Sequence, residues 1–599
     1  MSGFTPKNQL PKLLKDIDVG RTGTPGPGPS WLYIWNYTYL SPLAMAEFPP
    51  PADFPTSDWI LKVAERVVEA ALNSIDLEAD SATKSRFKEK AIALKASIET
   101  RNVTIAAVKD LVSDITAFGS IHSSDRPKSI DDYAKLFRVI GLPAVASDYN
   151  QDSTFAAMRT AGPNPLMIRR IRELPDKFPI TDAQFKSVVM GDSIAAALGE
   201  GRMYFCDYEM LATQQVDPKV SPVKFAYVPM ALFCAARNSG ALVPVAIQTQ
   251  QQPVRSGIQS NLFLADSSPS WLIAKTIVEM ADGNIHEAVM HLGRTHLLIE
   301  PFVVATGRKL DPNHPVTRLL WPHFEGTLLI NFAAVFTLLT KGGALEQLDN
   351  GTIESILKMT TQDLVEHYPF NNSFLPASFS ANGGRDVMDL KDYAYRDDSL
   401  QYWNAIRAWV HQYLSDYYSA STDPNDPRSV LHDIPLQQWC LELISQNGGR
   451  VKGFGINDQI PTLDYLEQAL TMIIFTSSVQ HAAVNFPQYN LMSYCPNMPL
   501  ACYSQFPGTT PAGLQQYLDI LPPIARATLQ MNVGFVLGSV NYTELGVYPP
   551  DYFTGEQAAQ AAAFRRALDG IDSSIKEKNA FRRPYQTLRR AGIPQSINI

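Results

Sequence analysis

His286, His291 and His296 recur at intervals of five residues inside a largely apolar run from Trp271 to Thr306. Imidazole nitrogens are common metal ligands, so three of them along one helix indicate a metal site. On an α-helix, five residues leave neighbouring histidines about 140° apart around the axis, on different faces. The wider i→i+5 winding of a π-helix would bring them onto one face. The spacing therefore predicts a buried helix with π-helical winding.

A second window, His481 to Asn485, places a histidine and an asparagine four residues apart, so that they share one helical face. A single histidine on an apolar helix is more often a core residue than a ligand. Several together need partners for all their ring nitrogens, and one metal ion would satisfy several at once. The two windows together are therefore candidates for one metal centre.

The donor types restrict which metal is expected. His286-Glu287 is followed by His291, one residue too far for the HExxH motif of zinc proteases. Nitrogen and oxygen donors without a thiolate suit iron or manganese, and they leave zinc open.

Three separated motifs carry a family resemblance: HEAVMHLGRTHLLIEPFVVAT from His286, IIFTSSVQHAAVNFPQYN from Ile473, and the terminal IPQSINI. HFEGTLLIN, YRDD and AGPNPLMIRR add to it. Together these segments resemble a lipoxygenase, most closely of bacterial or cyanobacterial type, over roughly residues 150 to 599. The motifs lie far apart and keep the family's order, so the resemblance is specific.

The resemblance implies a non-haem iron dioxygenase, with iron expected in preference to manganese. Its implied ligands are His291, His296, His481, Asn485 and the terminal carboxylate of Ile599. Three neutral imidazoles, an amide oxygen and one carboxylate would leave a coordination position open, as a catalytic metal needs. The implied reaction inserts O2 into a polyunsaturated fatty acid with a cis,cis-1,4-pentadiene. Fe(III)–OH would first abstract a hydrogen atom from the pentadiene, and addition of O2 to the resulting radical would then give mainly S hydroperoxides.

Further residues match the family's motifs beside the metal. His286 matches a histidine that is not a ligand, and Gln488 matches a glutamine that links the metal side to the substrate pocket. Glu287 stands where plant relatives carry glutamine, which leaves the hydrogen bonds around His286 open. The resemblance also implies three pocket residues. They are Ala334, the stereochemical position, and Leu338 and Leu537, which clamp the pentadiene.

Two other classes of function compete with a dioxygenase. A zinc hydrolase could use the same histidines, but the chain lacks HExxH, and zinc seldom takes an amide ligand such as Asn485. A non-catalytic fatty-acid-binding protein could retain a degenerate site, although here every ligand position of the family is filled.

Composition is that of a globular protein that does not bind nucleic acid. The 599 residues are 45% hydrophobic and 18% charged, with a net charge of −8 and a pI of about 5.7. Five unpaired cysteines and an N-terminus without an apolar signal region predict a cytoplasmic protein, with peripheral membrane contact as an option. We expect a monomer whose partners are the fatty acid and O2. The sequence has too many Arg and Lys residues to show which of them binds the substrate carboxylate.

The fold prediction is mainly α: a large helical catalytic domain with a small antiparallel β subdomain. Residues 1–57 form a Pro/Gly-rich arm, residues 58–120 form helices packed on the body, and residues 121–599 form the catalytic domain. We see no alternating strands for the lipid-binding β-barrel of plant and animal relatives. The apolar face of residues 58–75 could contact a membrane, but we favour packing on the body.

Strands are predicted between residues 201 and 265, where MYFCDY, VKFAYVPMALF, LVPVAIQTQ and NLFLAD are separated by turn residues. The helical pattern then resumes at 271–300, 315–341, 352–366, 398–419, 436–446, 463–483, 512–519, 523–538 and 556–579.

Overall fold

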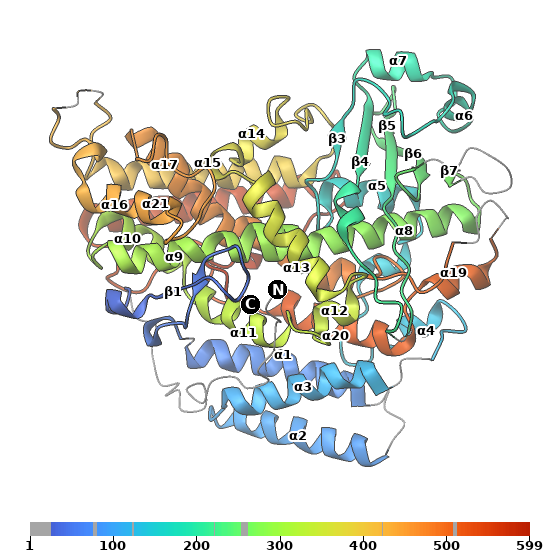
Figure 1. Cartoon of the computed structure of the whole chain (residues 1–599), viewed down its shortest axis with the longest axis horizontal. Coiled ribbons are helices and arrows are strands. Elements are labelled where there is room, and N and C mark those ends of the chain that lie inside the picture. The colour runs from blue at the N-terminus through green and yellow to red at the C-terminus, as the bar shows by residue number, and fades with distance from the viewer. Residues whose placement is uncertain are drawn as a thin grey trace.

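The computed structural model describes residues 26–599 except 55, 76–80, 122–124, 221, 253–260, 422, 424 and 507–511. Helices make up most of it, and one long helical element crosses the middle of the molecule (Figure 1). The main sheet lies toward one end of this element (Figure 1). Toward the other end lie helices α15 (Ala394–Ser415), α16 (Ile434–Ile444), α17 (Leu463–Phe475) and α21 (Gly555–Lys578). The predicted fold class, mainly helical with a small antiparallel sheet, is confirmed.

The central element consists of α8 (Pro269–Ile285), the π-helical segment η6 (His286–Leu297) and α9 (Leu298–Lys309). Ser268 caps its start by accepting a hydrogen bond from the Trp271 N–H (3.2 Å), and Pro269 occupies the first helical position. Pro301 lies in the first turn of α9, and the helix continues through it. The predicted π-helical winding is confirmed, and it covers all three histidines of the first motif.

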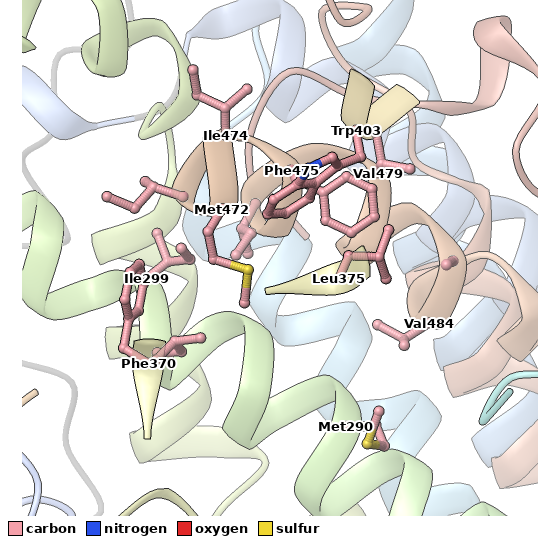
Figure 2. Close-up of a cluster of buried hydrophobic side chains, with 14 of the residues drawn as sticks. Met290, Ile299, Phe370, Leu375, Trp403, Met472, Ile474, Phe475, Val479 and Val484 are labelled. Carbon is pink, nitrogen blue, oxygen red and sulfur yellow. The ribbon is translucent and has the colours of Figure 1, made fainter. Parts of the chain in front are cut away.

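A second buried element carries the other motif. It runs through α17 (Leu463–Phe475), the π-helical segment η11 (Thr476–Gln480) and α18 (His481–Asn485). α17 packs against α15 (Ala394–Ser415), where the ring of Phe475 meets Trp403 edge-on at 5.5 Å. Figure 2 shows this part of the core, in which Val479 and Met472 lie among side chains from several helices. Hydrophobic burial thus holds both histidine-bearing elements in the centre of the molecule.

The main sheet has five strands in the order β3-β4-β5-β6-β7, and all neighbouring pairs are antiparallel. Four of its strands lie where strands were predicted: β4 (Met203–Asp207), β5 (Met230–Ala235), β6 (Leu242–Gln248) and β7 (Leu262–Leu264). The short β3 (Arg169–Arg170) was not predicted. The sheet lies to one side of the helical body (Figure 1).

The described part of the predicted N-terminal arm lies over the body. Tyr33 and Met45 are buried in the main core, and β1 (Trp35–Asn36) pairs with β2 (Met45–Ala46). Two short 3-10 turns, η2 (Ser30–Leu32) and η3 (Pro51–Asp53), complete this stretch. Residues 1–25 of the arm lie outside the described residues.

Three helices follow: α1 (Ser57–Ile75), α2 (Ser81–Glu99) and α3 (Ile105–Ile121). They form a layer along one side of the molecule, at the bottom of Figure 1. The apolar face of α1, including Ile60, Val63 and Val67, is buried in a cluster shared with α2, α3 and α20 (Ile524–Ser539). This face therefore packs within the protein, as we favoured.

The remaining helices surround these elements. They are α4 (Asp131–Ala134), α5 (Asp152–Ala161), α6 (Asp182–Val188), α7 (Ile194–Gly199), α10 (Pro315–Leu320), α11 (Thr327–Thr337), α12 (Ala344–Leu348), α13 (Ile353–Gln362), α14 (Leu375–Phe379), α16 (Ile434–Ile444), α19 (Leu514–Ile520) and α21 (Gly555–Lys578). The single helix predicted for 315–341 was wrong. It is broken between α10 and α11, because Pro322 lies in a 3-10 turn and Gly326 adopts a left-handed φ of 82°.

Among the described residues, no single helix has the length and apolar composition needed to cross a membrane; only the bent pair Pro315–His323 and Thr327–Thr337 meets both criteria when taken together.

Candidate metal centre and adjoining pocket

The two helical elements bring three imidazoles together in the core. His291 and His296 come from η6 and His481 begins α18, and one ligand atom from each lies within 4.8 Å of the others. Their ring centroids are 4.9 to 5.5 Å apart. All three side chains are buried. The π-helical winding produces this convergence, because it places residues five apart on one face.

His296 is oriented by a chain of buried polar groups. Its Nδ1 lies 2.8 Å from Asn331 Oδ1, and the Asn331 amide donates to the backbone oxygen of His296 (3.0 Å) and to Glu300 Oε2 (2.8 Å). Glu300 in turn accepts from the Ala46 N–H (2.7 Å). Because Asn331 Oδ1 can only accept, Nδ1 carries the proton, and Nε2 is free to face the centre.

Glu287 lies beside two of the motif histidines. Its carboxylate oxygens are 3.5 Å from His286 Nδ1 and 3.6 Å from His291 Nδ1. Burial acts to raise the pKa of Glu287, but the adjoining imidazoles lower it to about 2. The ionised carboxylate therefore orients the His291 ring with Nε2 inward, 3.3 Å from His296 Nε2. The sequence left open how Glu287 interacts around His286; in the structure its carboxylate lies against both His286 and His291.

His286 differs from the other three histidines. Its Nε2 lies 2.6 Å from the Val484 carbonyl oxygen and donates to it, while its Nδ1 faces Glu287. Both nitrogens are directed at these neighbours and away from the other three histidines.

Asn485, the last residue of α18, and Gln488, three residues further on, extend the site. Asn485 donates from Nδ2 to the Leu537 carbonyl (2.8 Å), and its Oδ1 accepts from Gln488 Nε2 (2.9 Å). The second lone pair of Oδ1 remains available to a metal. Gln488 also lines the pocket described below, so its side chain lies between Asn485 and that pocket.

Burial keeps the three imidazoles neutral. It lowers the pKa of His291, and burial with the adjacent His291 lowers the pKa of His296 to about 3. Burial and the two neighbouring rings lower the pKa of His481 well below its usual value. Neutral imidazole is the form that binds a metal. Apart from an interaction with the backbone of Ile599, neither ring nitrogen of His481 has a polar partner within the described residues, which a metal ligand role would explain.

The C-terminal residues of the chain lie beside the three histidines. The Trp59 indole N–H donates to the Asn598 carbonyl (2.6 Å), and the Thr327 hydroxyl donates to the Ile597 carbonyl (3.1 Å). The tail passes close to Gly326. A Cβ at this position would lie 3.0 Å from the Asn598 Cβ, so the glycine allows the close approach. Ile599 is buried, lines the pocket, and interacts through its backbone with His481.

A cavity enclosing about 1830 Å³, including its opening to solvent, borders the histidines. It reaches from α1 and α3 past α11 and α20 to α12 and the adjoining Asp349. Ala334, Leu338 and Leu537 all line it, beside His291 and His296. Most other lining side chains are apolar, which is typical of a site for a small apolar ligand.

Sequence reasoning missed several polar residues of this region. Asn331 and Glu300 orient His296, and a lone asparagine inside the apolar run Leu328–Leu339 was a readable signal, since buried amides need partners. Asp349 and Lys109 also line the cavity, and no local motif marks either of them.

A mainly helical fold with convergent buried imidazoles beside an apolar cavity defines a class, that of metal-dependent enzymes with an apolar substrate. A model of the lipoxygenase family matches residues 63–593. The chain belongs to the lipoxygenase family and is an enzyme of lipoxygenase type.

Similar proteins span most of the chain. It is 33% identical to the linoleate 9/13-lipoxygenase of Pseudomonas aeruginosa, over 95% of this chain and 89% of that protein. It is 34% identical to the polyunsaturated fatty acid lipoxygenase ALOX15B of Rattus norvegicus, over 79% and 69% of the two chains. The solved structure of a calcium-dependent 11R-lipoxygenase superposes with a TM-score of 0.72 at 28% identity. The match covers 79% of this chain and 70% of that one.

Proposed function

We propose that this enzyme uses non-haem iron to insert O2 into polyunsaturated fatty acids that carry a cis,cis-1,4-pentadiene, giving mainly S hydroperoxides. One observation carries the proposal: three buried, neutral imidazoles converge at the wall of a long apolar cavity. The relatives support the substrate class, since their names specify linoleate and polyunsaturated fatty acids.

The proposed iron ligands are His291, His296, His481, the Asn485 side-chain oxygen and the Ile599 carboxylate. The donor set fits the metal, because neutral nitrogen and oxygen donors without thiolate suit iron. His481 adds a specific argument, since its ring nitrogens are buried and, among the described residues, have no polar partner other than the backbone of Ile599, itself a proposed ligand. Iron, when bound, would supply the oxidant that takes a hydrogen atom from the doubly allylic carbon and leaves a pentadienyl radical.

The protein's own residues position the substrate and exclude water. Leu338 and Leu537 line the cavity beside the histidines, where they would hold the pentadiene at a fixed depth. Ala334 lies on the same wall and would decide which end of the radical O2 can reach. Gln488 connects Asn485 to the cavity by its 2.9 Å hydrogen bond, so substrate binding and ligand orientation are coupled there.

The test combines metal analysis with turnover. We expect about one iron per chain, a rise in conjugated-diene absorbance when linoleate and O2 are supplied, and mainly S products in chiral chromatography. Zinc in place of iron, with ester hydrolysis, would favour the hydrolase. Tight fatty-acid binding without diene formation in the iron-loaded protein would favour a non-catalytic binding protein.

A further inference from the structure

The face of α3 that borders the cavity carries one charged side chain. Ile105, Val108, Lys109 and Val112 all line the cavity, and their spacing of three, four and seven residues places them on one face of the helix. Three of the four are apolar, as packing against a lipid-like ligand requires. Lys109 breaks that pattern, and its four-carbon stem can lie along the apolar wall with the ammonium at the edge.

Lys109 is the only Lys or Arg among the described residues that line the cavity. Its residue is exposed, so the ammonium lies where the cavity meets solvent. Within the described part of the chain its side chain has no ion-pair partner, whereas the neighbouring Lys90 pairs with Asp110 and Asp114 at 2.9 and 2.7 Å. An unpaired cation at the mouth of an apolar cavity is placed to meet an anionic head group.

The opposite end of the cavity is buried and has no such cation. Leu348, Asp349, Leu500 and Gln530 line it, and each is at most 5% exposed. Neither carboxyl oxygen of Asp349 has a hydrogen-bond partner among the described residues, and burial raises the pKa of this group well above its usual value. A fatty-acid carboxylate placed here would lose its water without gaining a countercharge, which is costly.

Two buried cations lie near this closed end. Arg526 donates to the Gln347 side-chain oxygen and does not line the cavity, and Lys224 is engaged by backbone carbonyls. Its buried ammonium donates to the backbone carbonyls of Glu346 (2.7 Å) and Asp349, and it does not line the cavity. The two ends of the cavity therefore differ. An ammonium without an ion-pair partner among the described residues lies at the open end, and a buried carboxyl without a hydrogen-bond partner among them lies at the closed end.

From this difference we propose that Lys109 binds the substrate carboxylate at the mouth of the cavity, so that the fatty acid enters methyl end first. The proposal rests on the proposed fatty-acid substrate and adds the residue that fixes its direction. It also assigns α3 a role in the substrate site, because the head group would be held by a helix outside the metal-bearing core. With this direction and Ala334 in place, linoleate would be oxygenated at carbon 13.

The first experiment measures binding without turnover. Oleate has a carboxylate but no 1,4-pentadiene, so calorimetry with the iron-loaded protein reports its binding alone. We expect Lys109→Leu to weaken oleate binding about fivefold, as loss of a partly exposed ion pair predicts. Lys109→Arg should retain binding, because it retains the charge. Methyl oleate should bind all three proteins alike, since it offers no carboxylate.

Lys95→Leu is the matched control. Lys95 is exposed on α2 and does not line the cavity, so this variant removes the same charge from the same layer. Oleate binding that weakens equally in both leucine variants would show a general charge effect and overturn the assignment. So would oleate binding that Lys109→Leu leaves unchanged.

The second experiment measures direction. Lys109→Leu should raise KM for linoleate, leave kcat nearly unchanged, and increase the share of product oxygenated at carbon 9, because reversed entry is no longer opposed at the mouth. An unchanged product ratio and KM, with normal wild-type turnover, would refute the role of Lys109. Absence of any oxygenated product from the wild-type protein would instead refute the proposed function, so the two failures are distinct.

Discussion

At the scale of single residues, the metal centre depends on which ring nitrogen of each histidine is committed elsewhere. Asn331 and Glu287 engage the Nδ1 atoms of His296 and His291, so the Nε2 atoms point inward. His286 uses Nε2 on a backbone carbonyl and points away. Four histidines of similar burial therefore divide into three candidate ligands and one supporting residue.

Substitution of the histidines tests this division. His291→Ala, His296→Ala and His481→Ala should each abolish iron binding, because neutral imidazoles form most of the donor set. His286→Ala should impair the protein but retain some iron. Metal analysis of the four purified variants gives the ranking, and the assignment would be off by five residues if His286 proved essential and His296 dispensable.

Asn331 provides a test that leaves every ligand in place. Asn331→Ala removes the acceptor for His296 Nδ1 and frees Glu300, so the ring can rotate. We expect iron affinity to fall about 10- to 100-fold, the usual effect of losing a group that orients a ligand. Competition with a chelator measures it, with the exposed Asn102→Ala as control. Equal affinities in the two variants would contradict the orienting role.

Ala334 is the residue at which stereochemistry should be decided. Its methyl group lies on the cavity wall near Leu338, and packed walls relax only partly around a lost methyl. Ala334→Gly should therefore open space near one end of the pentadiene and shift the product from S toward R at the other end. Chiral-phase chromatography of both proteins' products measures the shift. Mainly R product from the unmodified enzyme would refute this role.

At the scale of elements, periodicity predicted most helices and strands but not the breaks between them. The run from 463 to 483 was read as one helix and is one continuous element, although η11 changes its winding. The run 315–341 has the same apolar character but is broken at Gly326, where the C-terminal tail passes. Because that contact joins residues far apart in the chain, local pattern could not predict it.

The candidate site shows the same limit. The histidines and Asn485 could be found from motifs, since their spacing follows one helix face. Lys109 and Asp349 could not, because tertiary packing brings both of them to the site from other elements. Glu300 lies on the central element itself, but it acts on His296 only through Asn331 of α11.

A buried ion-pair network joins the central helix α8 to its neighbours. Arg159 on α5 donates to Glu279 (2.6 Å) and to the Tyr208 hydroxyl (2.6 Å), and it lies 3.3 Å from Asp282. Arg159→Met leaves two buried carboxyls without their cation. We expect a loss of about 3 kcal/mol in the free energy of unfolding near pH 8.

The loss in the free energy of unfolding caused by Arg159→Met should become smaller on acidification. Burial raises the pKa of Glu279 to about 8 and also raises that of Asp282, and Arg159 opposes both shifts. Without Arg159 the folded state holds these protons more strongly than the unfolded state does. Stability is then retained at acid pH and lost as pH rises. Urea unfolding at pH 5 and pH 8 measures this change, with Arg66→Met, which breaks a partly exposed ion pair, as control. A deficit that grew toward pH 5 would contradict this account.

At the scale of the whole molecule, helices that are distant in sequence hold the C-terminal tail beside the candidate metal centre. α1 contributes Trp59, which holds the Asn598 carbonyl, while α11 begins beside the same tail through Thr327. The last three residues are each at most 5% exposed. The tail is therefore enclosed by side chains from other parts of the chain.

This arrangement predicts that the terminus serves the metal more than the fold. Deleting Ile599, or adding a C-terminal extension, should remove or displace the terminal carboxylate from beside His481. We expect loss of iron and of activity with helical content largely retained, because most of the core forms without this residue. Ile599→Val is the matched control, since it keeps the carboxylate and an apolar side chain, and it should keep its iron. Metal analysis and circular dichroism of the three proteins measure both properties, and full iron content in the deleted protein would refute the terminal ligand.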